Sequence, residues 1–171
     1  FFESGAPPDT KLLLYCGGAF ATIGYSVRYL LQVPNNLGAF GEAGIPGVIL
    51  SLGDLALPGL FLLTLYFRRT SALSLALPTT LLCLDVVSGT ILFAKTQALL
   101  PLIVYALAML HGDAPVKKLA LATGIITATF VFLVPIISYG RAELLAQYGN
   151  INRGALSERL QILMRYVSGE T

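Results

Sequence analysis

Long runs of hydrophobic residues separated by short polar links dominate the chain. Five such runs lie at 11–33, 45–67, 71–93, 94–110 and 119–139. Most of them approach or exceed the roughly 20 apolar residues that a helix needs to cross a bilayer. Because a backbone in lipid must satisfy its own hydrogen bonds, these runs predict helices whatever their content of β-branched residues. The pattern predicts an all-α fold, a polytopic transmembrane helix bundle with about five spans.

The fourth run is the shortest and contains Pro101, so two topologies stay open. Residues 97–110 reach the length of a span only when 94–96 are included, which predicts a tilted or incomplete helix. In the alternative topology this run re-enters the membrane and the protein has four spans. We prefer five spans.

After Gly140 the pattern changes to short alternations of polar and apolar residues. One helical face collects the apolar positions of this part: Leu156, Leu160, Leu163 and Val167. Glu158 and Arg165 fall off that face, which is typical of an amphipathic helix. The chain therefore divides into a transmembrane region, 1–140, and an amphipathic extramembrane segment, 141–171. This segment either packs onto the bundle or lies on the membrane surface.

Composition supports a membrane location and excludes several classes of soluble protein. Of the 171 residues, 56% are hydrophobic and 12% are charged, about half the charged fraction of an average soluble domain. The formal net charge is only +2, and no basic stripe with interleaved aromatic residues appears, so we expect no nucleic-acid partner. The first partner expected is the lipid bilayer itself.

The sequence offers no metal site and no cofactor motif. Cys16 and Cys83 lie inside apolar runs, where a free thiol behaves as a small hydrophobic group. His111 has no companions at ligand spacing. There is no P-loop, no GxGxxG, no HExxH and no GxSxG, so nucleotide-dependent enzymes, metallopeptidases and serine hydrolases are not expected.

Apart from Lys11 and Lys95, which lie at the beginnings of their runs, three charged residues lie within the apolar runs, where a charge is costly unless it has a partner or a function. Asp54 is near the middle of the second run, Asp85 is in the third, and Arg28 lies near the end of the first. In one interpretation Arg28 pairs with one of the acids and the network only holds helices together. In the other, Arg28, Lys95 and Arg141 form an outward-open basic pocket for an anionic ligand, because guanidinium groups suit phosphate oxygens.

The distribution of basic residues predicts an orientation. With five spans, one side of the membrane collects the cations of the N-terminus and of two short loops: Lys11, Arg68, Arg69, Lys117 and Lys118. By the positive-inside rule this side is cytoplasmic. The C-terminal segment would then be periplasmic or external.

The stretch from Asp85 to Arg141 carries a family resemblance. It reads DVVSGTILFAKTQALLPLIVYALAML, then a basic loop, then a span that ends VPIISYGRAELL. This resembles the middle of oligosaccharide repeat-unit (O-antigen) polymerases of the Wzy type. The residues that match are Ser88, Gly89, Lys95, Pro135, Tyr139 and Arg141. Gly140 separates a Tyr–Arg pair that is usually adjacent in that family. Its members are much longer, so we expect this chain to be part of a longer protein.

The resemblance implies a metal-independent glycosyltransferase. Such a polymerase joins polyprenyl-pyrophosphate-linked oligosaccharide units at the outer face of the bacterial inner membrane, which is therefore the location that the resemblance implies for this chain. Arg141 and Arg28 would be the catalytic residues that contact the pyrophosphate. Substrate binding would fall to four further cations: Lys95, Arg153, Arg159 and Arg165. Asp54 and Asp85 would complete the charge network, with no metal and no cofactor.

Two other functions remain open. A non-catalytic subunit or assembly factor of a membrane complex needs only spans, an amphipathic tail and small-residue faces such as Gly17 with Ala21 and Gly18 with Thr22. An ion-coupled transporter would use the two acids of the apolar runs.

Overall fold

The computed structural model describes residues 10–40, 45–70, 75–112, 116–150 and 154–169, and every regular element in these ranges is helical. The elements are α1 (Thr10–Val27), η1 (Arg28–Gln32), α2 (Val33–Asn36), α3 (Gly47–Ser51), η2 (Leu52–Leu55), α4 (Ala56–Thr70), α5 (Ala76–Ile91), α6 (Lys95–Leu110), α7 (Val116–Tyr148) and α8 (Leu156–Ser168). The prediction of an all-α fold is confirmed.

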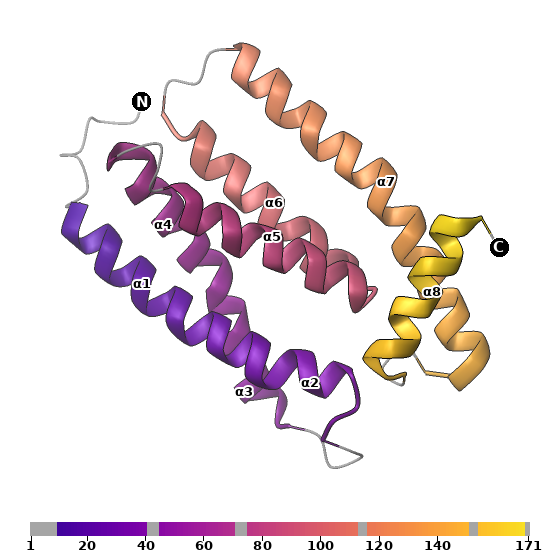
Figure 1. Cartoon of the computed structure of the whole chain (residues 1–171). Helices are drawn as coiled ribbons and strands as arrows, with labels where there is room; N and C mark the ends of the chain where they lie inside the picture. Colours follow the sequence, from indigo (N-terminus) through magenta and orange to yellow (C-terminus); the bar gives the residue numbers. More distant parts are fainter. Residues whose placement is uncertain (1–9, 41–44, 71–74, 113–115, 151–153, 170–171) are drawn as a thin grey trace.

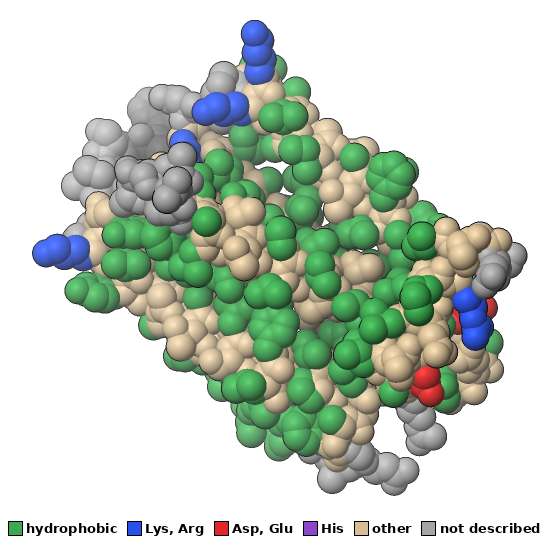
Figure 2. Space-filling model, viewed as in Figure 1, with side chains coloured by type: hydrophobic (Ala, Val, Ile, Leu, Met, Phe, Trp, Pro, Cys, Tyr) green, Lys and Arg blue, Asp and Glu red, His purple; other side chains and the backbone are tan. Residues whose placement is uncertain are grey.

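The long helices run up and down beside one another. In Figure 1, α1, α5 and α7 run in one direction and α4 and α6 return in the other. The starts of α1 and α7 therefore lie at the same end of the molecule as the ends of α4 and α6, and we call this the basic end. Figure 2 shows Lys and Arg side chains at this end and a broad hydrophobic surface beyond it. The short helix α8 crosses the far end of α7.

Two helices in the described part of the chain are long and apolar enough to cross a membrane. The first is Gly47–Arg68, with 22 residues, which joins α3, η2 and most of α4. The second is α7, Val116–Tyr148, with 33 residues. The apolar helices α5 and α6 have only 16 residues each. The prediction of about five spans is therefore not confirmed, and residues 71–74 of the third predicted span lie outside the described residues.

The C-terminal part divides differently from the predicted boundary at 140/141. α7 continues through Pro135 and Gly140 to Tyr148, so this boundary falls inside a helix. Pro135 leaves the helix unbroken, as neighbouring groups in a bundle allow. The chain turns at Gly149, whose φ of 66° suits glycine, and α8 follows.

α1 and α4 pack closely through small residues. Gly17, Ala21 and Gly24, spaced by four and three residues, share the face of α1 that meets α4. The predicted pair of Gly17 with Ala21 belongs to this interface. The second predicted pair does not, since a methyl group added at Gly18 would have no described atom within 4 Å. The hydroxyl of Thr22 instead donates to the Gly18 carbonyl at 2.8 Å.

We expect Gly24→Ala to weaken this interface. The added methyl group would overlap the backbone of Ala56, which cannot move aside as a flexible side chain does. Overpacking of this kind costs about 1–3 kcal/mol of unfolding free energy. The measurement is the thermal unfolding midpoint in detergent. Gly18→Ala, on an open face of the same helix, is the matched control, and equal midpoints for the two variants would contradict the interface.

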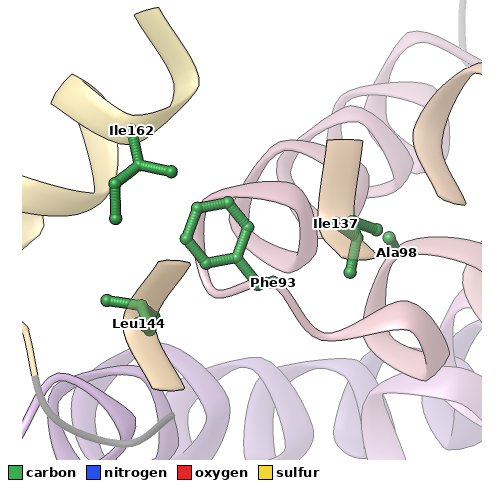
Figure 3. Close-up of a cluster of buried hydrophobic side chains, with 5 residues drawn as sticks. All are labelled: Phe93, Ala98, Ile137, Leu144 and Ile162. Atoms are coloured by element: carbon green, nitrogen blue, oxygen red, sulfur yellow. The ribbon is translucent and has the colours of Figure 1, made fainter. Parts of the chain in front are cut away.

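α8 packs on the bundle through a face other than the predicted one. Arg159 and Ile162 are its buried residues, whereas Leu156, Leu160 and Val167 are exposed. The predicted apolar face therefore mostly points outwards. The contact passes through a buried cluster that joins the α5–α6 turn to α6, α7 and α8: Phe93, Ala98, Ile137, Leu144 and Ile162. Figure 3 shows the Phe93 ring at the centre of this cluster.

Phe93 explains the glycine that separates Tyr139 from Arg141. The Phe93 backbone adopts a left-handed conformation, with φ 54°, which a bulky residue rarely does and which its surroundings must maintain. Its ring lies directly over Gly140, where a Cβ would overlap it. Gly140 therefore lets α7 approach the α5–α6 turn and brings Arg141 next to it.

Candidate functional site

A buried ion pair joins η1 to α5. Arg28 Nη1 lies 2.9 Å from Asp85 Oδ1, and the two residues are 4% and 0% exposed. The hydroxyl of Tyr25 donates to Asp85 Oδ2 at 3.0 Å, and that of Tyr29 to Oδ1 at 3.1 Å. The carboxylate thus accepts three hydrogen bonds, which offsets the cost of burying its charge. Of the two acids considered as partners, Arg28 pairs with Asp85.

Local helix geometry gathers the donors. Arg28 and Tyr29 follow Tyr25 by three and four residues, so all three lie on one helical face. Ser88 lies one turn after Asp85, where its hydroxyl donates to the Asp85 carbonyl at 3.1 Å and lies 3.4 Å from the Tyr29 hydroxyl. Sequence reasoning missed both tyrosines, although their spacing around Arg28 was visible.

Arg28 also lines a cavity of about 270 Å³ between η1, η2 and α6. Asp54 lines the same cavity, as do Gln32, Asn36, Thr96 and Gln97. Among the described residues, Arg28 Nε and Gln97 Nε2 are buried donors without a hydrogen-bond partner. A buried unsatisfied donor costs free energy, so a cavity lined by two such residues favours a ligand or water that accepts from them.

A second cavity of about 290 Å³ adjoins the first. Both are lined by Asn36, Thr96 and Gln97, and the second adds Lys95 and Arg141. The structure therefore brings three of the predicted site residues, Arg28, Lys95 and Arg141, to the walls of adjoining cavities, with Asp54 as the acid there. We call the two cavities together the basic pocket.

The first turn of α6 forms one wall of the basic pocket. The helix begins at Lys95 after an extended Ala94, and no described side chain caps it. The first N–H groups of a helix lack partners within the helix and carry partial positive charge. Since 95–97 line the pocket, these groups add to the charge of the cations, and the site suits an anion such as a phosphate.

Arg159 of α8 stabilises the walls of the basic pocket through hydrogen bonds to backbone carbonyls. It is 1% exposed and donates to the carbonyls of Leu92 at 3.0 Å, Asn36 at 3.2 Å and Gly154 at 3.2 Å. Burial lowers the pKa of its guanidinium below the ordinary value. Leu92 and Asn36 both line the pocket, so Arg159 ties α8 to its walls. Glycan binding by Arg159 stays a prediction, and in the structure its side chain is buried and donates to these three backbone carbonyls.

The remaining predicted residues lie elsewhere. Arg165 is exposed on α8, in a shallow hollow with Gln161 and Met164. Arg153 lies outside the described residues. No group of three or more His, Cys, Asp or Glu side chains among the described residues is placed to hold a metal ion.

Comparison with protein-family models, curated proteins and solved structures finds no match to this chain.

Proposed function

We propose that the chain is part of an integral membrane polymerase that joins polyprenyl-pyrophosphate-linked oligosaccharide units. In this proposal the basic pocket binds the pyrophosphate. The observation that carries it is the convergence of Arg28, Lys95 and Arg141 with the uncapped start of α6 around adjoining cavities. Pairs of arginines and a helix N-terminus are the groups that recognise phosphate oxygens in proteins.

The surface of α7 supports the membrane location. Only 6% of its most apolar stretch is buried, and Val131 and Phe132 are 59% and 72% exposed. The core helix of a soluble protein would instead be mostly buried. Lipid is the medium that accepts such a surface. The up-and-down order of the helices fits five spans, with the basic end in the cytoplasm and α8 outside.

The pocket residues suit a transfer in which pyrophosphate leaves. The acceptor sugar hydroxyl forms the new glycosidic bond while the bond from the anomeric carbon to the pyrophosphate breaks. Arg141, Lys95 and Arg28 would stabilise the charge that develops on the leaving pyrophosphate. Asp54 lines the pocket and would accept the hydroxyl proton, since Asp85 already accepts hydrogen bonds from three donors.

We expect Arg141→Ala to abolish polymer ladders in cells that depend on the full-length protein. Loss of one group that stabilises a developing negative charge lowers turnover by about 100- to 1,000-fold. The readout is the length distribution of the surface polysaccharide, alongside pyrophosphate binding by the purified protein. Lys117→Ala, an exposed cation at the basic end, is the control and should leave both unchanged. Normal ladders in Arg141→Ala would remove the basic pocket from the reaction.

A non-catalytic subunit is the second candidate, and a different feature of α7 favours it. Ala120, Gly124 and Ala128 are spaced by four residues along an exposed face that lines a shallow hollow. Small residues at this spacing let helices associate closely in lipid. Purification distinguishes the two functions, because a subunit travels with partner proteins, whereas a polymerase binds lipid-linked glycan alone. The intact mass of the native polypeptide adds a second test, since a mass near 18.2 kDa would favour the subunit.

An ion-coupled carrier receives less support. Its coupling acids, Asp54 and Asp85, have to exchange protons or sodium ions with water. Asp54 lines the basic pocket, but Asp85 is fully buried and held by Arg28 and two tyrosines. Proton- or sodium-driven uptake that disappears in Asp85→Asn, with the protein still folded, would restore this function.

A further inference from the structure

An apolar groove of about 630 Å³ opens between α6 and α7 near the basic end. Its walls come from Leu102 and Met109 of α6 and from Leu121 and Ile125 of α7, with Leu82 of α5 behind them. The volume lies within the range of sites that hold small molecules. This groove shares no lining residue with the basic pocket.

Two cations stand at one end of the groove. Lys118 belongs to the first turn of α7, and Arg68 lies near the end of α4. Arg68 Nη1 donates to the carbonyls of Ala108, at 3.1 Å, and His111, at 2.6 Å, so its guanidinium is fixed beside the last turn of α6. No described acidic side chain lines the groove. The groove therefore has an apolar length and a positively charged mouth.

We propose that this groove binds an anionic phospholipid, with an acyl chain between α6 and α7 and the phosphate against Arg68 and Lys118. The match of polarity supports this ligand, since an anionic headgroup on an apolar chain is charged at one end only. A transmembrane helix of another protein would fill the apolar part but would leave the cations at its mouth unmatched. Basic residues at this depth attract the anionic lipids of the cytoplasmic leaflet.

The inference rests on the membrane location under the proposed function and is independent of polymerase activity. The lipid would lie between α6 and α7 at the basic end and keep the two helices apart where the groove separates them. At the opposite end α7 is fixed by the Phe93 cluster. The lipid would therefore set the position of the free half of α7.

The test is native mass spectrometry of the full-length protein titrated with phosphatidylglycerol or with phosphatidylcholine of the same chain length. We expect preferential binding of phosphatidylglycerol, reduced about fivefold in Lys118→Ala, as loss of one juxtamembrane cation implies. Ala122→Phe, which places a ring in the groove without touching a charge, should reduce binding of both lipids. Lys117→Ala, next to the lining cation but absent from the groove, is the matched control.

Equal binding of the two lipids, or phosphatidylglycerol binding unchanged in both Lys118→Ala and Ala122→Phe, would overturn the inference. A protein partner that is displaced by Ala122→Phe would also overturn it. Failure of the membrane location is distinguishable, because the protein would then be released from membranes by alkaline carbonate. Failure of the polymerase is distinguishable too, since it is read from the ladders of Arg141→Ala rather than from lipid binding.

Discussion

Asp85→Ala is expected to destabilise the protein by about 3–5 kcal/mol. The substitution removes one partner of a buried ion pair and leaves the Arg28 guanidinium without its carboxylate. It also removes the acceptor of the Tyr25 hydroxyl, which becomes a buried unsatisfied donor, and it leaves the partly buried Tyr29 hydroxyl beside the Ser88 hydroxyl at 3.4 Å. The measurement is the unfolding midpoint of the detergent-solubilised protein, followed by circular dichroism.

Two further variants separate charge from packing at this position. Asp85→Asn keeps the shape and part of the hydrogen bonding, so it should lose less stability than Asp85→Ala. The double variant Arg28→Met with Asp85→Leu removes both charges, and apolar replacements of buried ion pairs are often neutral or stabilising. It should therefore recover much of the loss. A double variant less stable than Asp85→Ala would show that the network contributes through something other than the pairing of charges.

Arg159→Met is expected to release α8 from the bundle. The substitution keeps much of the side-chain volume but removes three hydrogen bonds from a charged donor to backbone carbonyls, and such bonds contribute about 1.5–3 kcal/mol each. The carbonyls of Leu92 and Asn36 would lose their buried donor as well. The measurement is amide hydrogen exchange across 154–169 and proteolysis before α8, both of which should accelerate at least 100-fold.

Arg165→Met on the same helix is the control, because Arg165 is exposed and its loss should leave exchange unchanged. Arg159→Lys should be intermediate, since one ammonium group cannot reach three carbonyls in the fixed directions of a guanidinium. If Arg159→Met left exchange unchanged but abolished polymer ladders, Arg159 would have to act on the glycan, and its assignment as a residue that stabilises the pocket walls would be wrong.

The helices were predictable because apolar runs bounded by turn residues leave a chain few alternatives. The run at 119–139 lies within α7, and the run at 45–67 is helical from Gly47 onward, through α3, η2 and α4. The cations of the basic pocket were also predictable in part, since charges in or beside apolar runs are expensive and stand out. Their convergence on the first turn of α6 required the fold.

Three features could not be read from the sequence. The pairing of Arg28 with Asp85 rather than with Asp54 depends on which residues of α5 and η2 face η1. The sequence does not show how these helices are turned towards each other, so it leaves both acids as possible partners. The face through which α8 packs on the bundle was not predicted, because Arg159 counts as a polar position in a hydrophobic pattern. In the structure Arg159 is buried and donates to backbone carbonyls. The sequence did not predict the extension of α7 beyond Gly140, because glycine often marks the end of a helix. In the structure the Phe93 ring occupies the space that a side chain at this position would fill, so glycine stands inside the helix.

The shortness of α5 and α6 has a consequence for the surrounding bilayer. Sixteen helical residues extend about 24 Å, whereas the hydrocarbon layer is about 30 Å thick. In the proposed placement the turn between these two helices, and the start of α6 with it, therefore lies below the level of the headgroups unless the membrane thins around it. Because of this hydrophobic mismatch, the thickness of the bilayer around the protein affects the free energy of bringing a charged ligand to the site. The proposed polymerase activity should consequently rise in bilayers of shorter-chain lipids, where the pyrophosphate of the proposed substrate has less hydrocarbon to cross.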